Sequence, residues 1–438
     1  MKKIYLKILL ILIVCFVVFH LNNKKQQLHI YLDPATTPAL LQMVDFIHQP
    51  TEDFKIVSWN RFDHHIKNKD HFKNTFFIPV DKNHISEDSY FFFQIKKLLK
   101  KNPNTDIHLH FNLMHPKAYH FLLEHTLIKD KIKSVHIYED ASGHIFRDEN
   151  VSFFPKSPKP KPFFYHWGNP NKICAPDFSS DSCKNFNTIK LYTTPIQIDF
   201  KKLTKTLSES DKKKVFDLAG FDYEKMNQLL NKKNPHFYIL GYNWRSSFYG
   251  AQLSALKELC NSKTNKNITW FYKNHPNNKF VPTHRTLQHL CPNIEPIDAH
   301  IPFELLLIGG FKNIKVSGYS SSLFFNQEKE NISNYMLREN DPYIQILTKA
   351  KSLKEDQIWD IPKQKESLEK SNIFELVYDQ KNKRAKWYLK IDEHTLLNIF
   401  NDHTIKILNQ TPTTLLIEDE NKKETYKKDE FYRYILTE

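Results

Sequence analysis

The chain has 438 residues, of which 40% are hydrophobic and 26% charged, a composition that excludes an intrinsically disordered protein. This length exceeds one ordinary hydrophobic core and predicts two domains with an appendage. Only 8 glycines occur, and the chain contains neither a G-x-G-x-x-G loop nor a Walker phosphate loop. The net charge is +14, but only 7 of the 63 basic residues are Arg, which argues weakly against a dedicated nucleic-acid-binding protein.

The five cysteines show no C-x-x-C pair and no His/Cys spacing typical of a metal site. Cys15 lies in the apolar N-terminal segment, and Cys174 and Cys183 are free to pair or to remain reduced. The cysteines therefore support no metal centre.

The N-terminus begins with Met1-Lys2-Lys3 and continues as an apolar run over residues 4–21. A basic start followed by an apolar stretch is typical of a signal peptide or a membrane anchor. No small-residue cleavage site follows, so we predict that residues 1–22 are an uncleaved anchor in preference to a removed signal. Lysines flank both ends of the run and leave its orientation open.

The first half of the chain alternates short apolar runs with longer amphipathic ones. Strands are predicted over 28–32, 55–58, 76–80, 106–111 and 134–138, and helices over 39–47, 90–100 and 117–127. Pro38 marks the start of the first helix, and Ser89 is a candidate cap for the second. This alternation predicts a parallel sheet with crossover helices.

The second half repeats this plan and then changes character. Strands are predicted over 236–240, 268–272 and 313–316, and helices over 251–259 and 303–308. The Lys/Pro-rich segment 155–162 is predicted to be an extended connector. After residue 363, short strands over 374–378, 387–391, 404–408 and 414–418 predict a small β-rich module without recognisable chemistry.

Candidate functional residues lie where the predicted strands end, because ligands of parallel sheets bind beyond the carboxyl ends of the strands. They are Asp33, Trp59, Arg61, Asn112, His115, Glu139, Asp140, Trp244, Lys273, His275 and Ser320–Ser322. Glu139-Asp140 is either a turn or cap signal or a general base, which the transfer of a group to a hydroxyl requires.

Two further segments fit an anionic ligand. Lys273-Asn274-His275-Pro276 places a cation and an imidazole after a strand, where His275 is either an ordinary loop residue or a phosphate ligand. Ser320–Ser322 precede a possible helix and serve either as a plain cap or as a phosphate cradle. Base, phosphate ligand and phosphate cradle together are more specific than any one of them.

These segments, in this order, resemble the bacterial sialyltransferases of glycosyltransferase family 80. The matching motifs are Tyr31-Leu32-Asp33-Pro34-Ala35, Arg61-Phe62, His110-Phe111-Asn112 with His115, Tyr138-Glu139-Asp140, Lys273-Asn274-His275-Pro276, Phe303-Glu304-Leu305 and Ser321-Ser322-Leu323-Phe324-Phe325. The resemblance extends over about residues 28–363. In place of the family's immediate glycine, Ala141-Ser142-Gly143 follow Asp140, and the tail after residue 363 has no counterpart.

The resemblance implies an α/β protein of the GT-B type, with two facing Rossmann-like domains and the C-terminal β-rich module. The implied parts are 27–190 (acceptor side and general base), 191–350 (CMP-sugar side), 351–365 (a segment returning to the first domain) and 366–438 (the β-rich appendage). It also implies inverting transfer of sialic acid from CMP-sialic acid to a galactose-terminated glycan, without a metal or any other cofactor.

The resemblance assigns roles to individual residues. Asp140 is implied as the base, and His275, Ser321 and Ser322 as ligands of the donor phosphate. Glu304 is implied to bind the ribose and Lys273 to lie near the cytosine, with Asn274 and Pro276 in the same donor segment. On the sugar and acceptor side stand Asp33, Arg61, Asn112, His115 and Trp244.

Further expectations concern the setting of the reaction. We expect lipooligosaccharide as the acceptor, a membrane surface as a partner, and an inner-membrane anchor with the catalytic part facing the cytoplasm. Two alternatives stay open: transfer of another CMP-activated acidic sugar, and a non-catalytic glycan- or nucleotide-binding protein on the same scaffold.

Overall fold

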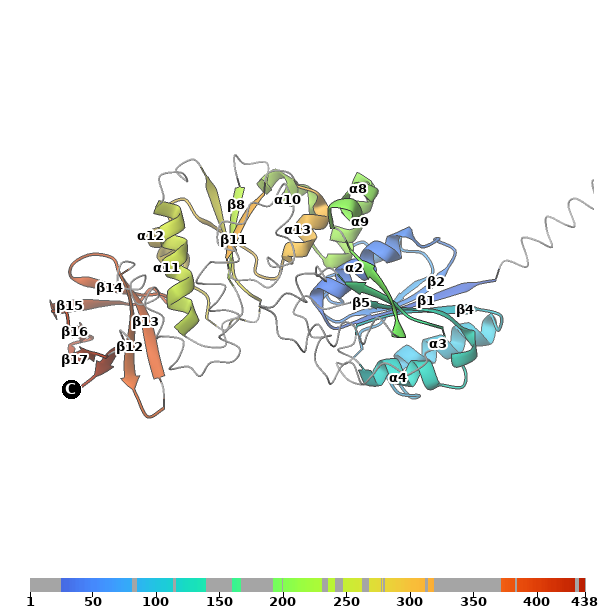
Figure 1. The fold of residues 1–438 in the computed structure, drawn as a ribbon, viewed down its shortest axis with the longest axis horizontal. Helices are drawn as coiled ribbons and strands as arrows, with labels where there is room; N and C mark the ends of the chain where they lie inside the picture. Colours follow the sequence, from blue (N-terminus) through green and yellow to red (C-terminus); the bar gives the residue numbers. More distant parts are fainter. Residues whose placement is uncertain are drawn as a thin grey trace, which may run out of the picture. The chain divides into compact units, whose positions relative to one another are not determined.

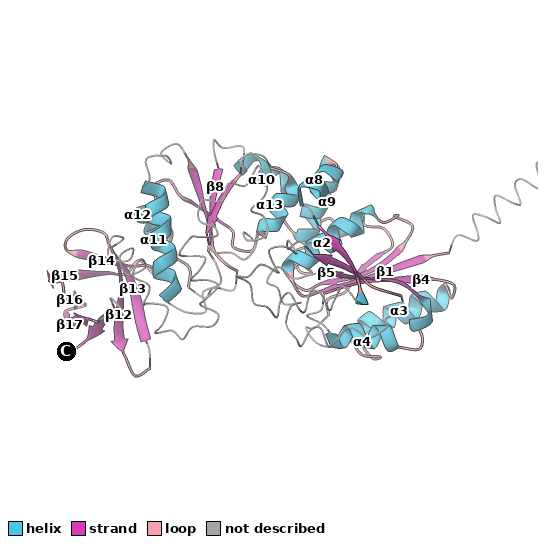
Figure 2. Ribbon diagram, in the orientation of Figure 1, coloured by secondary structure: helices cyan, strands magenta, loops and turns pink. Residues whose placement is uncertain are grey.

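The computed structural model describes residues 25–80, 85–112, 116–138, 160–166, 192–198, 200–230, 235–240, 247–261, 268–276, 278, 280–311, 314–318, 372–382, 384–429 and 433–437. The chain divides into two compact units, Met1–Tyr223 and Glu224–Glu438. Figures 1 and 2 show their helices and strands.

The first unit contains a parallel sheet of seven strands in the order β3-β2-β1-β4-β5-β6-β7 (Figure 1). The strands are β1 (Gln27–Asp33), β2 (Phe54–Trp59), β3 (Thr75–Phe77), β4 (Asp106–Phe111), β5 (Ile132–Tyr138), β6 (Phe163–His166) and β7 (Thr194–Gln197). The strand order reverses between β1 and β4, which makes the carboxyl ends of these two strands the favoured place for a ligand.

The two faces of this sheet carry different side chains, because successive residues of a strand point to opposite faces. Helices α3 (Tyr90–Lys101) and α4 (Pro116–Glu124) cover an apolar face built from Leu28, Ile30 and their neighbours. Helix α2 (Thr36–His48) lies on the opposite face and contacts α9 (Glu209–Ala219) (Figure 1). The short helices η1 (Lys69–His71), η2 (Lys129–Lys131) and α8 (Phe200–Thr206) complete the described part of the unit.

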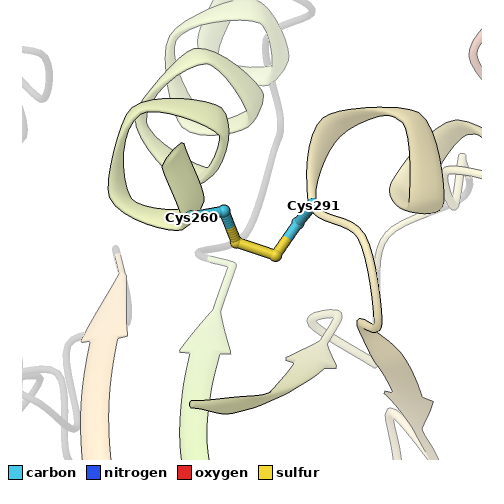
Figure 3. The surroundings of a disulfide bond; sticks show 2 residues. All are labelled: Cys260 and Cys291. Carbon is cyan, nitrogen blue, oxygen red and sulfur yellow. A yellow bond between two sulfur atoms is a disulfide. The ribbon is translucent and has the colours of Figure 1, made fainter. Parts of the chain in front are cut away.

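The second unit repeats this plan with a parallel sheet in the order β10-β9-β8-β11. The strands are β8 (Pro235–Ile239), β9 (Thr269–Lys273), β10 (Glu295–Ile297) and β11 (Lys315–Gly318), and the helices are α11 (Ser247–Asn261), α12 (His284–Leu290) and α13 (Phe303–Gly309). Helix α10 (Tyr223–Leu230) lies at the division between the units. A disulfide joins Cys260, at the end of α11, to Cys291, directly after α12 (Figure 3), a pairing that the cysteine spacing does not predict.

Gly318 ends β11 with a φ of +130°, a conformation that side chains rarely adopt. A Cβ atom at this position would collide with the carbonyl oxygen of Ile239 on β8. Only glycine therefore lets β11 leave the sheet at the point where the strand order reverses.

The C-terminal strands form a closed barrel within the second unit. They are β12 (Ile373–Asp379), β13 (Arg384–Lys390), β14 (Thr395–Asn398), β15 (Thr404–Gln410), β16 (Thr414–Asp419), β17 (Lys422–Lys428) and β18 (Tyr434–Leu436). Trp387, Leu389 and Ile399 of the barrel share one hydrophobic core with α11, α12 and the second sheet. The β-rich module predicted from the sequence is therefore confirmed, and it packs firmly on the domain that precedes it.

Most predicted elements agree with the structure to within a few residues, and Ser89 accepts a hydrogen bond from the backbone N–H of Phe92 as a helix cap. The domain bounds stay a prediction, although β7, which follows the expected boundary at residue 190, hydrogen-bonds to β6 in the first sheet.

The predicted localisation, an inner-membrane protein held by a single N-terminal anchor, is wrong. No helix within the described residues is long and apolar enough to cross a bilayer, so a single N-terminal membrane anchor is not supported. Residues 1–24, on which that expectation rested, lie outside the described part of the chain.

Candidate functional site

The second unit buries a cationic side chain at the end of β9. Lys273 is 5% exposed, and its Nζ donates hydrogen bonds to the carbonyl oxygens of Ala299 (3.0 Å) and Asn274 (3.4 Å). Burial lowers the pKa of Lys273 to about 8, and the carboxylates of Glu304 and Asp298 oppose that fall. At neutral pH the strand end therefore carries a buried positive charge with little water around it.

Asn274, the next residue, has an amide group that the protein uses only in part. Its Oδ1 accepts a hydrogen bond from Asn278 Nδ2 at 2.8 Å, whereas its buried Nδ2 has no partner within the described part of the chain. Leaving a buried donor unsatisfied costs about 1–3 kcal/mol, so such a group calls for an explanation. An acceptor oxygen of a ligand bound at this strand end would satisfy the amide.

Glu304 lies in the first turn of α13 and is 6% exposed. Its carboxylate interacts electrostatically with Lys273, which places both charges in one region of the second unit. His275 and Pro276 follow directly in the turn after β9, where the N–H of Asn278 donates to the carbonyl of His275. The structure thus brings a buried cation, an amide donor and a carboxylate together beside the end of β9.

Trp244, Ser321 and Ser322, which were predicted for the sugar and donor sides, lie outside the described residues. Trp244 comes a few residues after β8, and Ser321 and Ser322 come shortly after Gly318 at the end of β11. Strands β8 and β11 are neighbours at the reversal of the strand order. Their positions in the chain therefore agree with the rule that ligands bind beyond such strand ends, and their contacts stay predictions.

The first unit brings other predicted residues to the carboxyl edge of its sheet. Asp33 ends β1, and Asn112 follows β4, the neighbouring strand. Asp33 is fully buried and accepts hydrogen bonds from the N–H of Ala35 and from Gln42 Nε2, both at 2.8 Å. Asp33 therefore fixes the loop that enters α2. Arg61, another predicted sugar-side residue, lies exposed in the turn after β2.

The predicted base, Asp140, and the predicted sugar ligand His115 lie outside the described residues. Tyr138, two residues before Asp140, ends β5 and is buried. Since β5 pairs with β4, its carboxyl end belongs to the same edge as Asn112. Asp140 follows this strand end by two residues in the sequence, and its place and role stay predictions.

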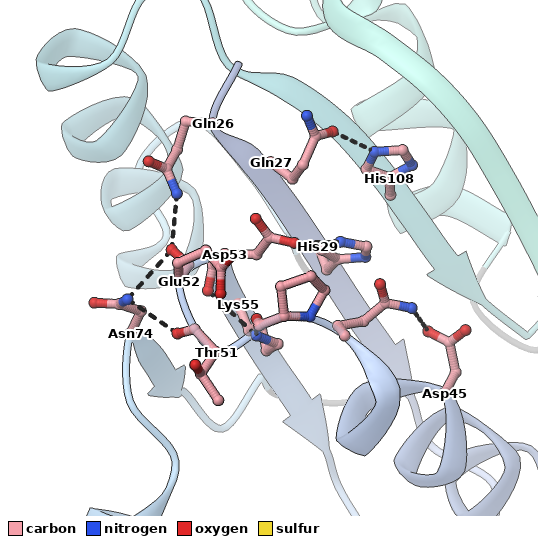
Figure 4. A network of polar contacts seen from close by, with 12 residues as sticks. Gln26, Gln27, His29, Asp45, Thr51, Glu52, Asp53, Lys55, Asn74 and His108 are labelled. Atoms are coloured by element: carbon pink, nitrogen blue, oxygen red, sulfur yellow. Dashed lines mark hydrogen bonds and ion pairs between the residues drawn. The ribbon is translucent and has the colours of Figure 1, made fainter. Parts of the chain in front are cut away.

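A row of histidines crosses the α2 face of the first sheet, which is unusual because parallel sheets are normally apolar on both faces. His29 of β1 pairs in register with His108 of β4, and His110 of β4 pairs with His136 of β5. Figure 4 shows His29 beside His108, with Asp45 approaching from α2. Burial is the main cause that lowers the pKa of all four, to about 3 for His29 and about 4 for His136.

One chain of hydrogen bonds runs across this face, and its partners determine which ring nitrogens carry a proton. His108 Nε2 lies 2.8 Å from the amide oxygen of Gln27, which only accepts, so His108 carries its proton there. Ser134 Oγ then donates to His108 Nδ1 and accepts from His136 Nε2, each at 2.7 Å. Tyr165 Oη completes the chain by donating to His136 Nδ1 at 2.9 Å. These half-buried polar groups satisfy one another as neutral species.

Sequence reasoning missed this histidine face, although a signal was present. The motifs DIHLHF and SVHIY place histidines on alternate positions of predicted strands, and alternate positions share one face. Which histidines meet across strands depends on the strand register, which the motifs alone do not specify.

The family model described as Sialyltransferase PMO188 matches residues 198–372, less than half of the chain. No curated protein matches the chain.

Solved structures match much more of it. The crystal structure of an α/β-galactoside α-2,3-sialyltransferase from the luminous marine bacterium Photobacterium phosphoreum is 16% identical, with a TM-score of 0.54, over 77% of this chain and 100% of that chain. A sialyltransferase from Photobacterium damselae, represented by its GT-B domain, is 19% identical, with a TM-score of 0.51, over 74% of this chain and 97% of that chain. Likeness at these identities shows the GT-B fold.

Proposed function

From the confirmed resemblance to the bacterial sialyltransferases, we propose that this chain transfers sialic acid from CMP-sialic acid to a terminal galactoside. The family model covers the part of the chain that contains Lys273, Asn274 and Glu304, which supports a nucleotide-sugar site in the second unit. The relative from Photobacterium phosphoreum is an α/β-galactoside α-2,3-sialyltransferase, which supports a galactoside as the acceptor.

The observation that carries this proposal is the buried group at the end of β9. A nucleotide monophosphate leaving group offers phosphate oxygens, ribose hydroxyls and a base with several acceptors. The unsatisfied amide of Asn274 fits an acceptor oxygen, the carboxylate of Glu304 fits donor hydroxyls, and the buried ammonium of Lys273 fits a carbonyl or an anion. These groups are arranged before the ligand arrives, which is what electrostatic stabilisation of a leaving phosphate requires.

In the proposed reaction, Asp140 accepts the proton of the galactose hydroxyl as that oxygen attacks the sialyl carbon. His275, Ser321 and Ser322 stabilise the charge that develops on the departing CMP phosphate. Asp33, Arg61, Asn112, His115 and Trp244 belong to the sugar and acceptor side. The net charge of +14 favours an anionic glycolipid, and we propose lipooligosaccharide as the natural carrier of the galactoside.

The direct test incubates the full-length protein with CMP-sialic acid and lactose and identifies products by mass spectrometry and NMR. Sialyllactose supports the donor, the reaction and the acceptor class together. Transfer of a different CMP-activated acidic sugar, with none of sialic acid, would replace the donor in this proposal. Binding of CMP-sialic acid without turnover on any galactoside would favour a non-catalytic binding protein.

A substitution with a matched control tests CMP binding at the donor site separately from the stability of the fold. Glu304→Gln removes the charge that would bind ribose hydroxyls, and we expect CMP affinity to fall about tenfold, since hydrogen bonds to charged groups are worth about 1.5–3 kcal/mol. Glu258→Gln, on the exposed side of α11, is the matched control and should leave CMP affinity unchanged. Calorimetric titration with CMP measures both; equal affinities in the two variants would remove Glu304 from the donor site.

A further inference from the structure

A second polar group lies on the α2 face of the first sheet, beside the chain that ends at Tyr165. It consists of His29 on β1, His110 on β4 and Asp45 on α2, and one ligand atom from each lies within 4.8 Å of the others. The two histidines are buried, and the Asp45 side chain is 27% exposed. His29 lies four residues before the end of β1 and His110 one residue before the end of β4, and none of the three is among the predicted substrate residues.

We propose that His29, His110 and Asp45 form a binding site for one divalent transition-metal ion of the zinc class. Two imidazole nitrogens and one carboxylate oxygen are a ligand set that zinc uses, with water in the fourth position. The same set offers borderline ligands that prefer zinc or cobalt over magnesium or calcium.

The distance between the two imidazole nitrogens fits such an ion. Zinc bonds of about 2.0–2.1 Å in a tetrahedron place neighbouring ligand atoms about 3.4 Å apart. His29 Nδ1 lies 3.3 Å from His110 Nε2, so an ion would replace the proton that these atoms share. Asp45 Oδ2 lies 3.5 Å from the other ring nitrogen of His110, and one oxygen of its carboxylate lies within 4.8 Å of a ring nitrogen of each histidine, so the carboxylate must turn toward Nε2 to complete the ligand set.

The rings of both histidines are already held in place. His108 stacks on His29 with ring centroids 4.7 Å apart, and His136 and Tyr31 stack on the two sides of His110 at 4.6 and 4.2 Å. Ordering these rings therefore adds little to the entropic cost of binding an ion.

Outer partners orient the ligands in the manner that metal sites require. The carboxylate of Asp53 lies 3.8 Å from His29 Nε2, the nitrogen that faces away from His110. Tyr138 Oη lies 3.3 Å from His110 Nδ1, and Tyr31 Oη donates to Asp45 Oδ2 at 2.7 Å. With Asp45, the Asp53 carboxylate brings two negative charges near the ion, while the Lys55 ammonium is engaged by the carbonyls of Pro50 and Asp53.

An ion at this position would join β1, β4 and α2, so its role is structural and separate from sugar transfer. Binding to the folded state alone stabilises it in proportion to the logarithm of the ion concentration. The untagged full-length protein, freed of metal by a chelator, is titrated with Co²⁺ and Zn²⁺. Visible absorption of tetrahedral Co²⁺ and calorimetry report binding, and thermal unfolding reports stabilisation.

We expect about one ion per chain and a raised melting temperature, with affinity reduced at least about tenfold in Asp45→Asn and His29→Gln. Asp45→Asn keeps the size of a partly exposed side chain, so it tests the site even if His29→Gln does not fold. His125→Gln alters a histidine that contacts Glu87, Phe92 and Phe121 on the opposite side of the sheet, and it should bind within about twofold of the parent protein. Absence of saturable binding, equal binding by Asp45→Asn, or equal loss in His125→Gln would overturn the assignment.

Discussion

The two parallel sheets bury polar residues in different ways. In the first sheet the buried and half-buried histidines lie within the strands, and their ring nitrogens have partners on neighbouring strands and on α2. In the second sheet Lys273 and Asn274 lie at the strand end, where the amide of Asn274 has no partner in the described residues. Polar groups that satisfy one another build the scaffold, whereas a buried group left unsatisfied at a strand end indicates where a ligand completes the set.

The sheets also complete their cores differently. The apolar face of the first sheet is covered by α3 and α4, its own crossover helices. The core of the second sheet includes barrel side chains such as Trp387 and Leu389 together with α11 and α12. The barrel is therefore part of the folding unit that carries the proposed donor site.

The largest effect is expected from the predicted base on the first unit. Asp140→Asn keeps the shape of the side chain but cannot accept the proton of the acceptor hydroxyl, so kcat should fall about 10²–10⁴-fold. CMP affinity should stay unchanged, because the donor residues lie in the second unit. Kinetics with lactose, with CMP titration as the control, measure both; an unaltered kcat would assign the base to another residue.

A substitution that leaves a cavity in the barrel tests whether the barrel and the second sheet share one hydrophobic core. Leu389→Ala should destabilise the second unit by about 2–5 kcal/mol and expose the amides of β8 and β9 to hydrogen exchange. Leu415→Ala, in the barrel's own core, is the matched control and should leave the protection of β8 and β9 closer to that of the parent. Identical exchange patterns for the two variants would contradict a shared core.

A smaller effect concerns the charge of Lys273. Its pKa of about 8 means that raising the pH from 7 to 9 removes the ammonium, and CMP affinity should fall over that range. Stability moves the other way: between pH 8 and 10.5 the unfolded chain holds the proton more tightly than the folded one, so unfolding becomes less favourable as pH rises. Lys273→Met should bind CMP weakly with a flat pH profile, whereas Lys257→Met on α11 should keep the slope of the parent.

The smallest effect on stability is expected from removing helix caps, and we compare one cap in each unit. Thr283 caps α12 through the N–H of Thr286, and its hydroxyl also bonds Asp402 of the barrel. Ser208 caps α9 in the first unit without such a link. Each change to Ala should cost about 0.5–2 kcal/mol, with the larger loss for Thr283 because Asp402 also loses its partner. Denaturant unfolding decides the order, and a larger cost at Ser208 would count against the barrel link.

The sequence by itself determined where the principal strands and helices lie, because hydrophobic periodicity and caps such as Ser89 act within a few residues. It also pointed to the segment of Lys273 and Asn274, because strand ends are readable from the points where apolar runs stop. Glu304, in the first turn of α13, was pointed to only by the resemblance of Phe303-Glu304-Leu305 to the sialyltransferase motif.

Tertiary structure alone decided which distant residues meet. The pairing of Cys260 with Cys291, the closure of the barrel, the place of β7 in the first sheet and the contact of His29 with His110 all join residues far apart in the chain. The physical reason is that strand register and packing depend on the whole sheet, so no local pattern contains them.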